Sequence, residues 1–173
     1  MVKRHNRWEK RDERNQHHAE YPNEQVTALI DYNNDVTVDA VTLAKHLGPI
    51  LKAIRVDTSR ALIDHYFDGK DTSGFDPHGV CKQLIYALRK ILNDHGFNYV
   101  KIIVSSGFTA EKIDEWTKEG VPVDMYGVGT SLINNMTVGF TGDLVVLDGK
   151  DEAKEGRRNI PSKRLEKVLF PIY

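Results

Sequence analysis

Apolar and polar residues follow two different periods along the middle of the chain. A short apolar run at residues 26–30 ends in polar residues, as is typical of a buried parallel strand. Apolar residues then recur at helical spacing over residues 35–48, with Thr37 as the expected N-cap and Gly48 as the stop. The pattern predicts a strand followed by a helix.

This strand-to-helix unit is repeated, and a further strand closes the series. The later strands and helices are expected at residues 51–59 and 76–96, at 100–107 and 109–120, and, for the last strand, at 121–129. Asp76 and Thr109 are the expected N-caps of the second and third helices. Such alternation implies parallel strands with right-handed crossovers. The sequence therefore predicts the α/β class, as a partial, irregular (β/α) barrel with parallel strands followed by a short antiparallel β segment.

The pattern divides the chain into three segments. Residues 1–25 are dense in charged and amide side chains and are expected to form an arm. Residues 26–135 carry the partial barrel, interrupted at 61–75 by an unusually long loop that could contain a short helix. Residues 136–173 begin with alternating apolar residues and glycines, which predicts a β-hairpin and an extended C-terminal segment.

Composition narrows the class of protein. The 173 residues include 24 Lys and Arg against 25 Asp and Glu, a formal net charge of -1, so no overall field attracts nucleic acid or an anionic membrane. Cys81 is the only cysteine, which excludes an intrachain disulfide and favours a reducing compartment. No run of about 18 apolar residues occurs. We expect a soluble, cytoplasmic protein with neither a nucleic acid nor a membrane as partner.

Polar residues and glycines gather where the predicted strands end. Because the carboxyl ends of parallel strands meet at one edge of a sheet, these residues are expected to share a face. Each could instead simply cap the helix that follows it. The candidates are Asp31, Arg55, Asp57, Ser106, Gly107, Gly127, Gly129, Thr130 and Ser131.

Arg55 and Asp57 are two residues apart on a strand and should point to the same side. This cation and anion suit a ligand with anionic oxygens and hydroxyl groups or a metal; the alternative is a structural ion pair. The segment 127–131, Gly-Val-Gly-Thr-Ser, would expose consecutive backbone N–H groups at a helix start, where a phosphate is stabilised. Its glycines could equally serve only as turn residues.

Other polar side chains are weaker candidates. The adjacent His17 and His18 lack spaced metal-ligand partners. His65 is expected to be a surface loop residue, although it could act as a base, and Cys81 to be a small buried apolar residue. The cations of "AKEGRRN", among them Lys154, are either solvated or placed over a phosphate.

The blocks "IRVDTS", "VKIIVSSGFTAEKIDEWTKEGVPVDMYGVGTSL" and "FTGDLVVLDGKDEAKEGRRN" resemble, in order and spacing, the C-terminal half of nicotinate phosphoribosyltransferase. The resemblance covers roughly residues 26–159. It implies an irregular α/β barrel with an additional domain, and an enzyme that joins nicotinate to 5-phosphoribosyl 1-pyrophosphate, forming nicotinate mononucleotide and releasing pyrophosphate. It also implies Mg²⁺ with the pyrophosphate and, in many members, ATP as a co-substrate.

The resemblance also implies roles for individual residues. Gly129 and Thr130 would hold the 5-phosphate, with Gly107 on the neighbouring loop. Asp57 would contact the ribose hydroxyls, and Arg55 would lie beside the base or the phosphates.

Asp31, by the same resemblance, would lie near the pyrophosphate and its metal. Loss of pyrophosphate builds positive charge on the ribose and negative charge on the leaving group, so carboxylates and cations each stabilise one end.

The family's N-terminal half has no counterpart in this sequence. It carries an aromatic residue that clamps the base, an arginine for the nicotinate carboxylate, and a histidine that is phosphorylated during ATP coupling. The chain is therefore expected to be a fragment, one product of a split gene, or a degenerate relative that binds nucleotide without catalysis. A half barrel leaves a sheet edge uncovered, which favours a homo-oligomer or a partner chain that supplies the missing half. Two other hypotheses are a non-catalytic interaction subunit and a barrel-type phosphosugar isomerase or synthase.

Overall fold

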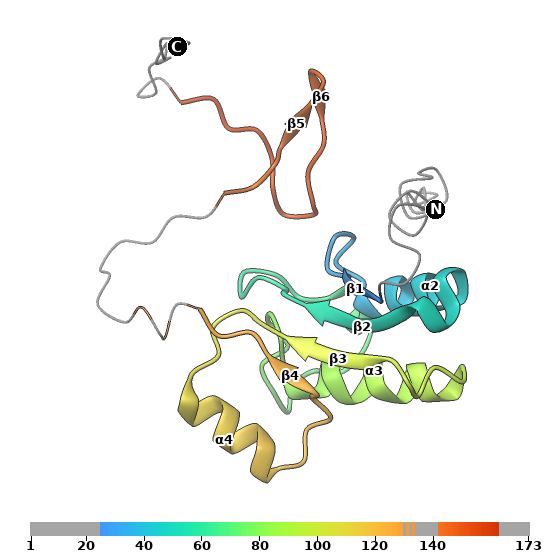
Figure 1. Ribbon diagram of the computed structural model, residues 1–173. Coiled ribbons are helices and arrows are strands. Elements are labelled where there is room, and N and C mark those ends of the chain that lie inside the picture. The colour runs from blue at the N-terminus through green and yellow to red at the C-terminus, as the bar shows by residue number, and fades with distance from the viewer. Residues whose placement is uncertain (1–24, 130, 132, 134–141, 163–173) are drawn as a thin grey trace.

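The computed structural model describes residues 25–129, 131, 133 and 142–162, and its main sheet has four parallel strands in sequential order. The strands are β1 (Val26–Leu29), β2 (Leu51–Val56), β3 (Lys101–Val104) and β4 (Met125–Tyr126). Helices α2 (Val36–Leu47), α3 (Lys82–Asp94) and α4 (Ala110–Lys118) follow the first three strands in turn (Figure 1). The predicted α/β class with parallel strands is confirmed.

One face of the sheet is packed against helices. Figure 1 shows α2 and α3 on the same side of the strands. Fully burying an aliphatic side chain contributes about 1.5–3 kcal/mol, so the aliphatic residues buried between the strands and these helices stabilise this layer. The completely buried residues at the centre of the layer are Ile54, Val56, Ile102 and Val104 of the strands and Leu84, Leu88 and Leu92 of α3.

The opposite face carries a row of partly exposed side chains. Leu29 pairs in register with Arg55, Arg55 with Ile103, and Ile103 with Met125. Residues in register on parallel strands point to one face. Leu29 is 40% and Met125 46% exposed, so the described residues leave this row partly uncovered.

Helix α2 begins earlier than predicted, and its N-cap is Asp35 rather than Thr37. The Asp35 carboxylate accepts the Val38 N–H at 3.3 Å. Thr37 lies inside the helix and its hydroxyl donates to Asp35 at 3.2 Å. The prediction of Thr37 was wrong because the Asp35 carboxylate caps N–H groups of an earlier turn, which places Thr37 inside the helix.

Helix α3 begins later than predicted, at Lys82, so Asp76 is not its N-cap. Residue Cys81 occupies the cap position without a side-chain hydrogen bond. The preceding segment is paired with the long loop instead, through a bridge between Ile63 and His78. Asp76 accepts the N–H of His78 at 3.0 Å and so closes a local turn.

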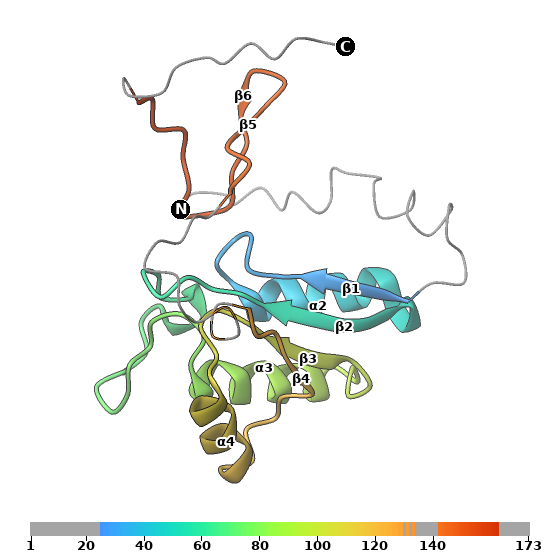
Figure 2. The same cartoon turned by 60° about the vertical axis from the view of Figure 1, so that its left-hand side comes forward.

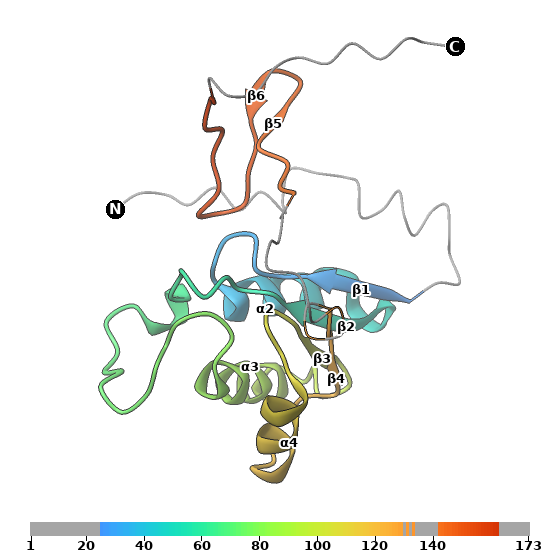
Figure 3. The same cartoon turned by 90° about the vertical axis from the view of Figure 1, so that its left-hand side faces the viewer.

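Thr109 caps α4 as predicted, accepting the Lys112 N–H at 3.3 Å. The inward-facing Trp116 is 2% exposed and packs edge-on against Phe108, with ring centroids 4.9 Å apart. The long loop between β2 and α3 contains the 3₁₀ helix η3 (His65–Phe67). Figure 3 shows that this loop extends beyond the end of the sheet. A second 3₁₀ helix, η2 (Gly48–Ile50), links α2 to β2.

The predicted antiparallel segment is also present. Strands β5 (Val146–Leu147) and β6 (Lys150–Asp151) form a hairpin, which stands apart from the main sheet in Figure 2. The boundaries proposed at residues 25 and 135 stay predictions, since residues 1–24 and 134–141 lie outside the described part. Within the described residues, no helix has the length and apolar character needed to cross a membrane.

Candidate functional site

A buried ion pair lies at the carboxyl end of β1. The Lys154 ammonium donates to Asp31 Oδ2 at 2.7 Å, and the Asp31 side chain is only 2% exposed. The other carboxylate oxygen, Oδ1, is buried and has no hydrogen-bond partner among the described residues. Buried polar atoms are normally satisfied, so this oxygen marks a place where a ligand, ion or water would bind.

Backbone and side-chain contacts bring Lys154 to this position. The Glu155 N–H donates to the Tyr32 carbonyl at 3.0 Å, in the loop after β1. The Glu155 carboxylate lies 2.9 Å from Nε2 of His65. Gly156 packs so closely on Leu62 that an added Cβ would lie 3.0 Å from its Cδ1. The segment after the β5–β6 hairpin is therefore docked on two loops of the main sheet.

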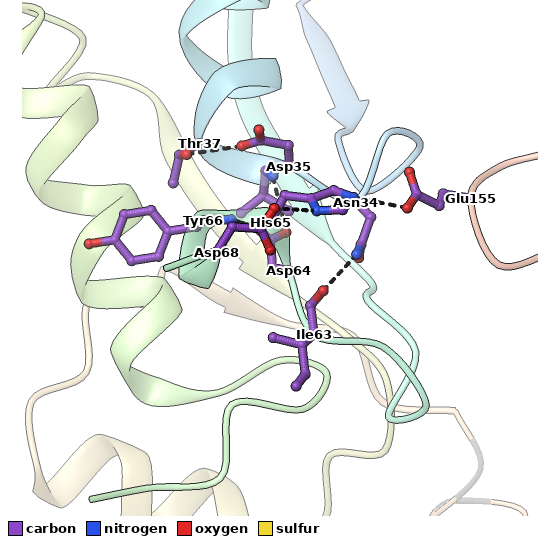
Figure 4. A network of polar contacts seen from close by, with 10 residues as sticks. Asn34, Asp35, Thr37, Ile63, Asp64, His65, Tyr66, Asp68 and Glu155 are labelled. Carbon is purple, nitrogen blue, oxygen red and sulfur yellow. Dashed lines mark hydrogen bonds and ion pairs between the residues drawn. The ribbon is translucent and has the colours of Figure 1, made fainter. Parts of the chain in front are cut away.

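The loops after β1 and β2 are joined by a polar network (Figure 4). Asn34, in a left-handed conformation with φ 53°, donates from Nδ2 to the Ile63 carbonyl at 2.7 Å. The main-chain carbonyl of Asn34 accepts the His65 N–H at 2.8 Å. His65 is thus a structural link between segments, which its loop position in the sequence did not indicate.

Asp64 is the completely buried acid of this network. Its carboxylate accepts the N–H groups of Val36 at 3.1 Å and Tyr66 at 2.8 Å. Burial raises the pKa of Asp64 to about 6, and the two backbone N–H groups oppose that rise. Asp64 holds the start of α2 against η3. It thereby joins the loop after β1, which contains Asp31, to the loop after β2.

Arg55 and Asp57 lie next to the Asp31 loop but are not paired with each other. The Ile30 N–H donates to the Arg55 carbonyl at 3.1 Å, which sets the loop after β1 beside β2. No ion pair within 4.0 Å joins Arg55 to Asp57, so the alternative of a structural ion pair is wrong. Arg55 is exposed on the open face of the sheet, and Asp57 is half-buried directly after β2.

The loops after β3 and β4 are in contact. An added Cβ at Gly127 would lie 3.0 Å from the Ser105 Cβ, so a larger residue here would require Ser105 to shift. The Gly127 N–H donates to the Val104 carbonyl at 2.7 Å, and the Ser131 hydroxyl donates to the Phe108 carbonyl at 3.2 Å.

Two donors of the predicted phosphate loop, the Gly127 N–H and the Ser131 hydroxyl, are therefore already engaged. An added Cβ at Gly129 would meet nothing within 4 Å, and Thr130 lies outside the described residues. Ser106 and Gly107 both have positive φ, 76° and 77°, at the end of β3. Positive φ in a serine is uncommon and places backbone N–H groups in an unusual direction.

The predicted residues thus fall into three neighbouring groups. Asp31 is paired with Lys154, Arg55 and Asp57 follow β2, and the remaining residues line the joined loops after β3 and β4. Thr58 follows Asp57 at the end of β2, and its buried hydroxyl has no partner among the described residues. Lys154 was visible only as one of several cations, because no local pattern relates it to Asp31.

The free carboxylate oxygen of Asp31 suits a metal ion that binds together with a substrate. Within the described residues, no group of three or more His, Cys, Asp or Glu side chains is placed to hold a metal. Mg²⁺ is commonly bound through one or two carboxylates together with substrate phosphates. The free Oδ1 of Asp31 is compatible with Mg²⁺ held in that way.

Among known proteins, the chain is similar to the crystal structure of nicotinate-nucleotide pyrophosphorylase from Pyrococcus furiosus. Sequence identity is 33%, the TM-score is 0.49, and the alignment covers 78% of this chain and 30% of that chain. This chain thus spans less than a third of the length of that protein, and a TM-score below 0.5 gives the likeness no weight for the overall fold. No family model and no curated protein matches the chain.

Proposed function

We propose that the chain takes part in phosphoribosyl transfer in NAD metabolism and, more finely, that it is the C-terminal half of a nicotinate phosphoribosyltransferase. The reaction would join nicotinate to 5-phosphoribosyl 1-pyrophosphate, giving nicotinate mononucleotide and pyrophosphate. The three sequence blocks that resemble this family contribute the ends of β2, β3 and β4 and the segment that carries Lys154, whereas Asp31, at the end of β1, lies outside them.

The observation that carries the proposal is the Asp31–Lys154 pair at the end of β1, next to the strand that bears Arg55. Pyrophosphate departure separates charge, leaving a cationic ribose and an anionic leaving group. A site with an acid and two cations can stabilise both ends of that transition state. In this mechanism Lys154 and Arg55 would attract the pyrophosphate oxygens.

The two carboxylates would act at different points of the reaction. Asp57 would hold the ribose hydroxyls as the positive charge develops on the ring. Asp31 would stabilise charge near the leaving group, and Mg²⁺ bound to the pyrophosphate would neutralise part of its charge. ATP would serve as a co-substrate, as in many nicotinate phosphoribosyltransferases.

The 5-phosphate would bind where the loops after β3 and β4 meet. Backbone N–H groups near Gly129 and Gly107 are the donors proposed for it, since the Gly127 N–H is bonded to Val104. The contact between Ser131 and Phe108 would hold the two loops at a fixed separation.

A second candidate function is a non-catalytic subunit that binds nucleotide or a partner chain. The row from Leu29 to Met125 on the open sheet face favours it, because large aliphatic side chains are exposed there. In an active enzyme the same face would be covered by a second copy or by a chain that supplies the missing half.

The test is to incubate the chain with nicotinate, 5-phosphoribosyl 1-pyrophosphate and Mg²⁺, with and without ATP, and to quantify nicotinate mononucleotide by chromatography. Calorimetry with nicotinate mononucleotide measures binding separately. Turnover supports the enzyme, and binding without turnover is the result expected of a non-catalytic subunit or of a half that needs the chain carrying the base-binding residues. Absence of both, in a chain shown by circular dichroism to be folded, would refute the proposal.

A further inference from the structure

A cavity of about 870 Å³ lies outside the strand ends, between the long loop and the first turns of α3 and α4. Of the predicted site residues that the structure describes, only Ser106 and Gly107 reach its wall; Asp31, Arg55, Asp57, Gly127, Gly129 and Ser131 do not. Its volume is within the range of small-molecule sites, about 300–1,000 Å³. It is therefore a separate cavity that touches the proposed phosphoribosyl site only at its rim.

The carboxylates that line this cavity all have partners in the protein. Asp76 is bonded to His78, through the N–H at 3.0 Å and the ring at 2.7 Å. Glu115 is paired with Lys82. The Glu111 carboxylate accepts its own backbone N–H and the Thr109 hydroxyl, and these hydrogen bonds lower its pKa. The negative charge of the wall is thus already compensated.

Two cations of the wall, Arg60 and Lys112, are compensated only at longer range, by Asp76 and Glu115 respectively. Neither forms a hydrogen bond or an ion pair with any residue in the described part of the chain. The Lys112 ammonium lies 4.2 Å from the Phe108 ring centroid and 5.1 Å from that of Trp116. Burial lowers the pKa of Lys112, and the charge of Arg60 lowers it further. The two cations therefore repel each other in one cavity, and an anion between them would relieve that repulsion.

The position of Arg60 is fixed by the backbone rather than by its side chain. Gly79, with φ 65°, packs so closely that an added Cβ would lie 3.1 Å from the Arg60 Cα. The Gly79 N–H donates to the Leu62 carbonyl at 2.8 Å, and the Leu62 N–H to Ser59 at 3.0 Å. This turn places the base of Arg60 at the cavity before any ligand binds, which reduces the entropy cost of binding.

We propose that this cavity binds a phosphorylated small molecule. Its phosphate lies between Arg60 and Lys112, and its organic part packs along Phe75. A phosphate dianion matches two cations that have no anion in direct contact, whereas a carboxylate would neutralise only one. The Ser106 hydroxyl at the rim supplies a further donor. Ser106 and Gly107 are the described residues that this site shares with the proposed phosphoribosyl site.

The experiment titrates the isotope-labelled full chain with ribose 5-phosphate and, separately, with inorganic phosphate, following backbone amides by NMR. We expect ribose 5-phosphate to shift the amides of Arg60, Gln83 and Lys112 and to bind at least tenfold more tightly than inorganic phosphate. The double variant Arg60→Met with Lys112→Met should weaken this binding at least tenfold. Lys118→Met, an exposed lysine of α4 paired with Asp114, is the matched control and should leave it unchanged.

Two outcomes would overturn the proposal. One is equal affinity for inorganic phosphate and ribose 5-phosphate, because the organic part would then not be recognised. The other is a set of shifts confined to residues 126–133 that Asp57→Asn abolishes and the double variant does not, because the ligand would then occupy only the phosphoribosyl site. If the double variant loses its dispersed spectrum, Lys112→Gln alone is measured, with the same tenfold weakening expected.

Discussion

Lys154 Nζ lies 2.7 Å from Asp31 Oδ2, although 123 residues separate the two in the sequence. The pair joins the segment after the β5–β6 hairpin to the end of β1, where the proposed chemistry takes place. The same contact is thus both a structural anchor and a source of charge for the site.

Replacing Lys154 by methionine should destabilise this anchor. Asp31 would remain buried without its cation, and breaking a buried pair in this way typically costs about 3–5 kcal/mol. We expect lower resistance to urea and faster hydrogen exchange of the Glu155 amide, which now donates to Tyr32. Lys150→Met, at an exposed position of β6, should change neither measurement. Unchanged exchange at Glu155 in the Lys154 variant would show that the pair does not hold the segment.

Asp57→Asn should retain the fold and weaken binding of nicotinate mononucleotide by more than about tenfold. The substitution removes a charged hydrogen-bond partner worth on the order of 1.5–3 kcal/mol. Calorimetry measures the affinity, and thermal melting reports the fold. Asp114→Asn, on the exposed face of α4, is the matched control and should leave the affinity unaltered. A lower melting temperature with unchanged affinity would assign Asp57 a structural role only.

The stability of the chain should fall as pH rises from 4 to 7, because of Asp64. Its pKa is raised from 3.8 to about 6 by burial, so the folded state binds this proton more tightly than the unfolded state does. The resulting stabilisation is complete below pH 3.8 and is lost as pH rises through 6, a change on the order of 3 kcal/mol. Urea unfolding across this range measures it.

Two variants separate Asp64 from the other acids. Asp64→Asn should flatten the pH dependence between 4 and 7. Asp71→Asn should leave this pH dependence unchanged. Asp71 is exposed, and the hydrogen bond that its carboxylate accepts from the Ser73 N–H lowers its pKa. An identical slope in the wild type and in Asp64→Asn would contradict the assignment.

Gly79→Ala should destabilise the chain more than Gly69→Ala does. Both glycines have positive φ, 65° and 73°, so each alanine meets a similar backbone strain of about 1–2 kcal/mol. Only at Gly79 would the new Cβ also press on the Arg60 backbone, since nothing lies within 4 Å at Gly69. Chemical denaturation of the two variants measures the difference, and equal losses would show that the approach to Arg60 imposes no constraint.

The sequence by itself determined the elements whose signals are local. The repeated strand-to-helix pattern predicted a helix within residues 76–96, where α3 lies, and Thr109 identified the start of α4. These succeed because helix periodicity and capping depend on residues within a few positions of each other. The parallel order of the sheet followed from the alternation of strands and helices.

Tertiary structure alone decided which polar groups meet. Asp76 has a capping sequence, yet pairing between Ile63 and His78 takes its segment out of the helix. Lys154 reaches Asp31, and Asp64 reaches the Val36 N–H, across separations that no local pattern encodes. The energies of such contacts arise from burial and from the low-dielectric interior that only the folded chain creates. Periodicity therefore positioned the strand ends, whereas folding determined the partners of the charges gathered there.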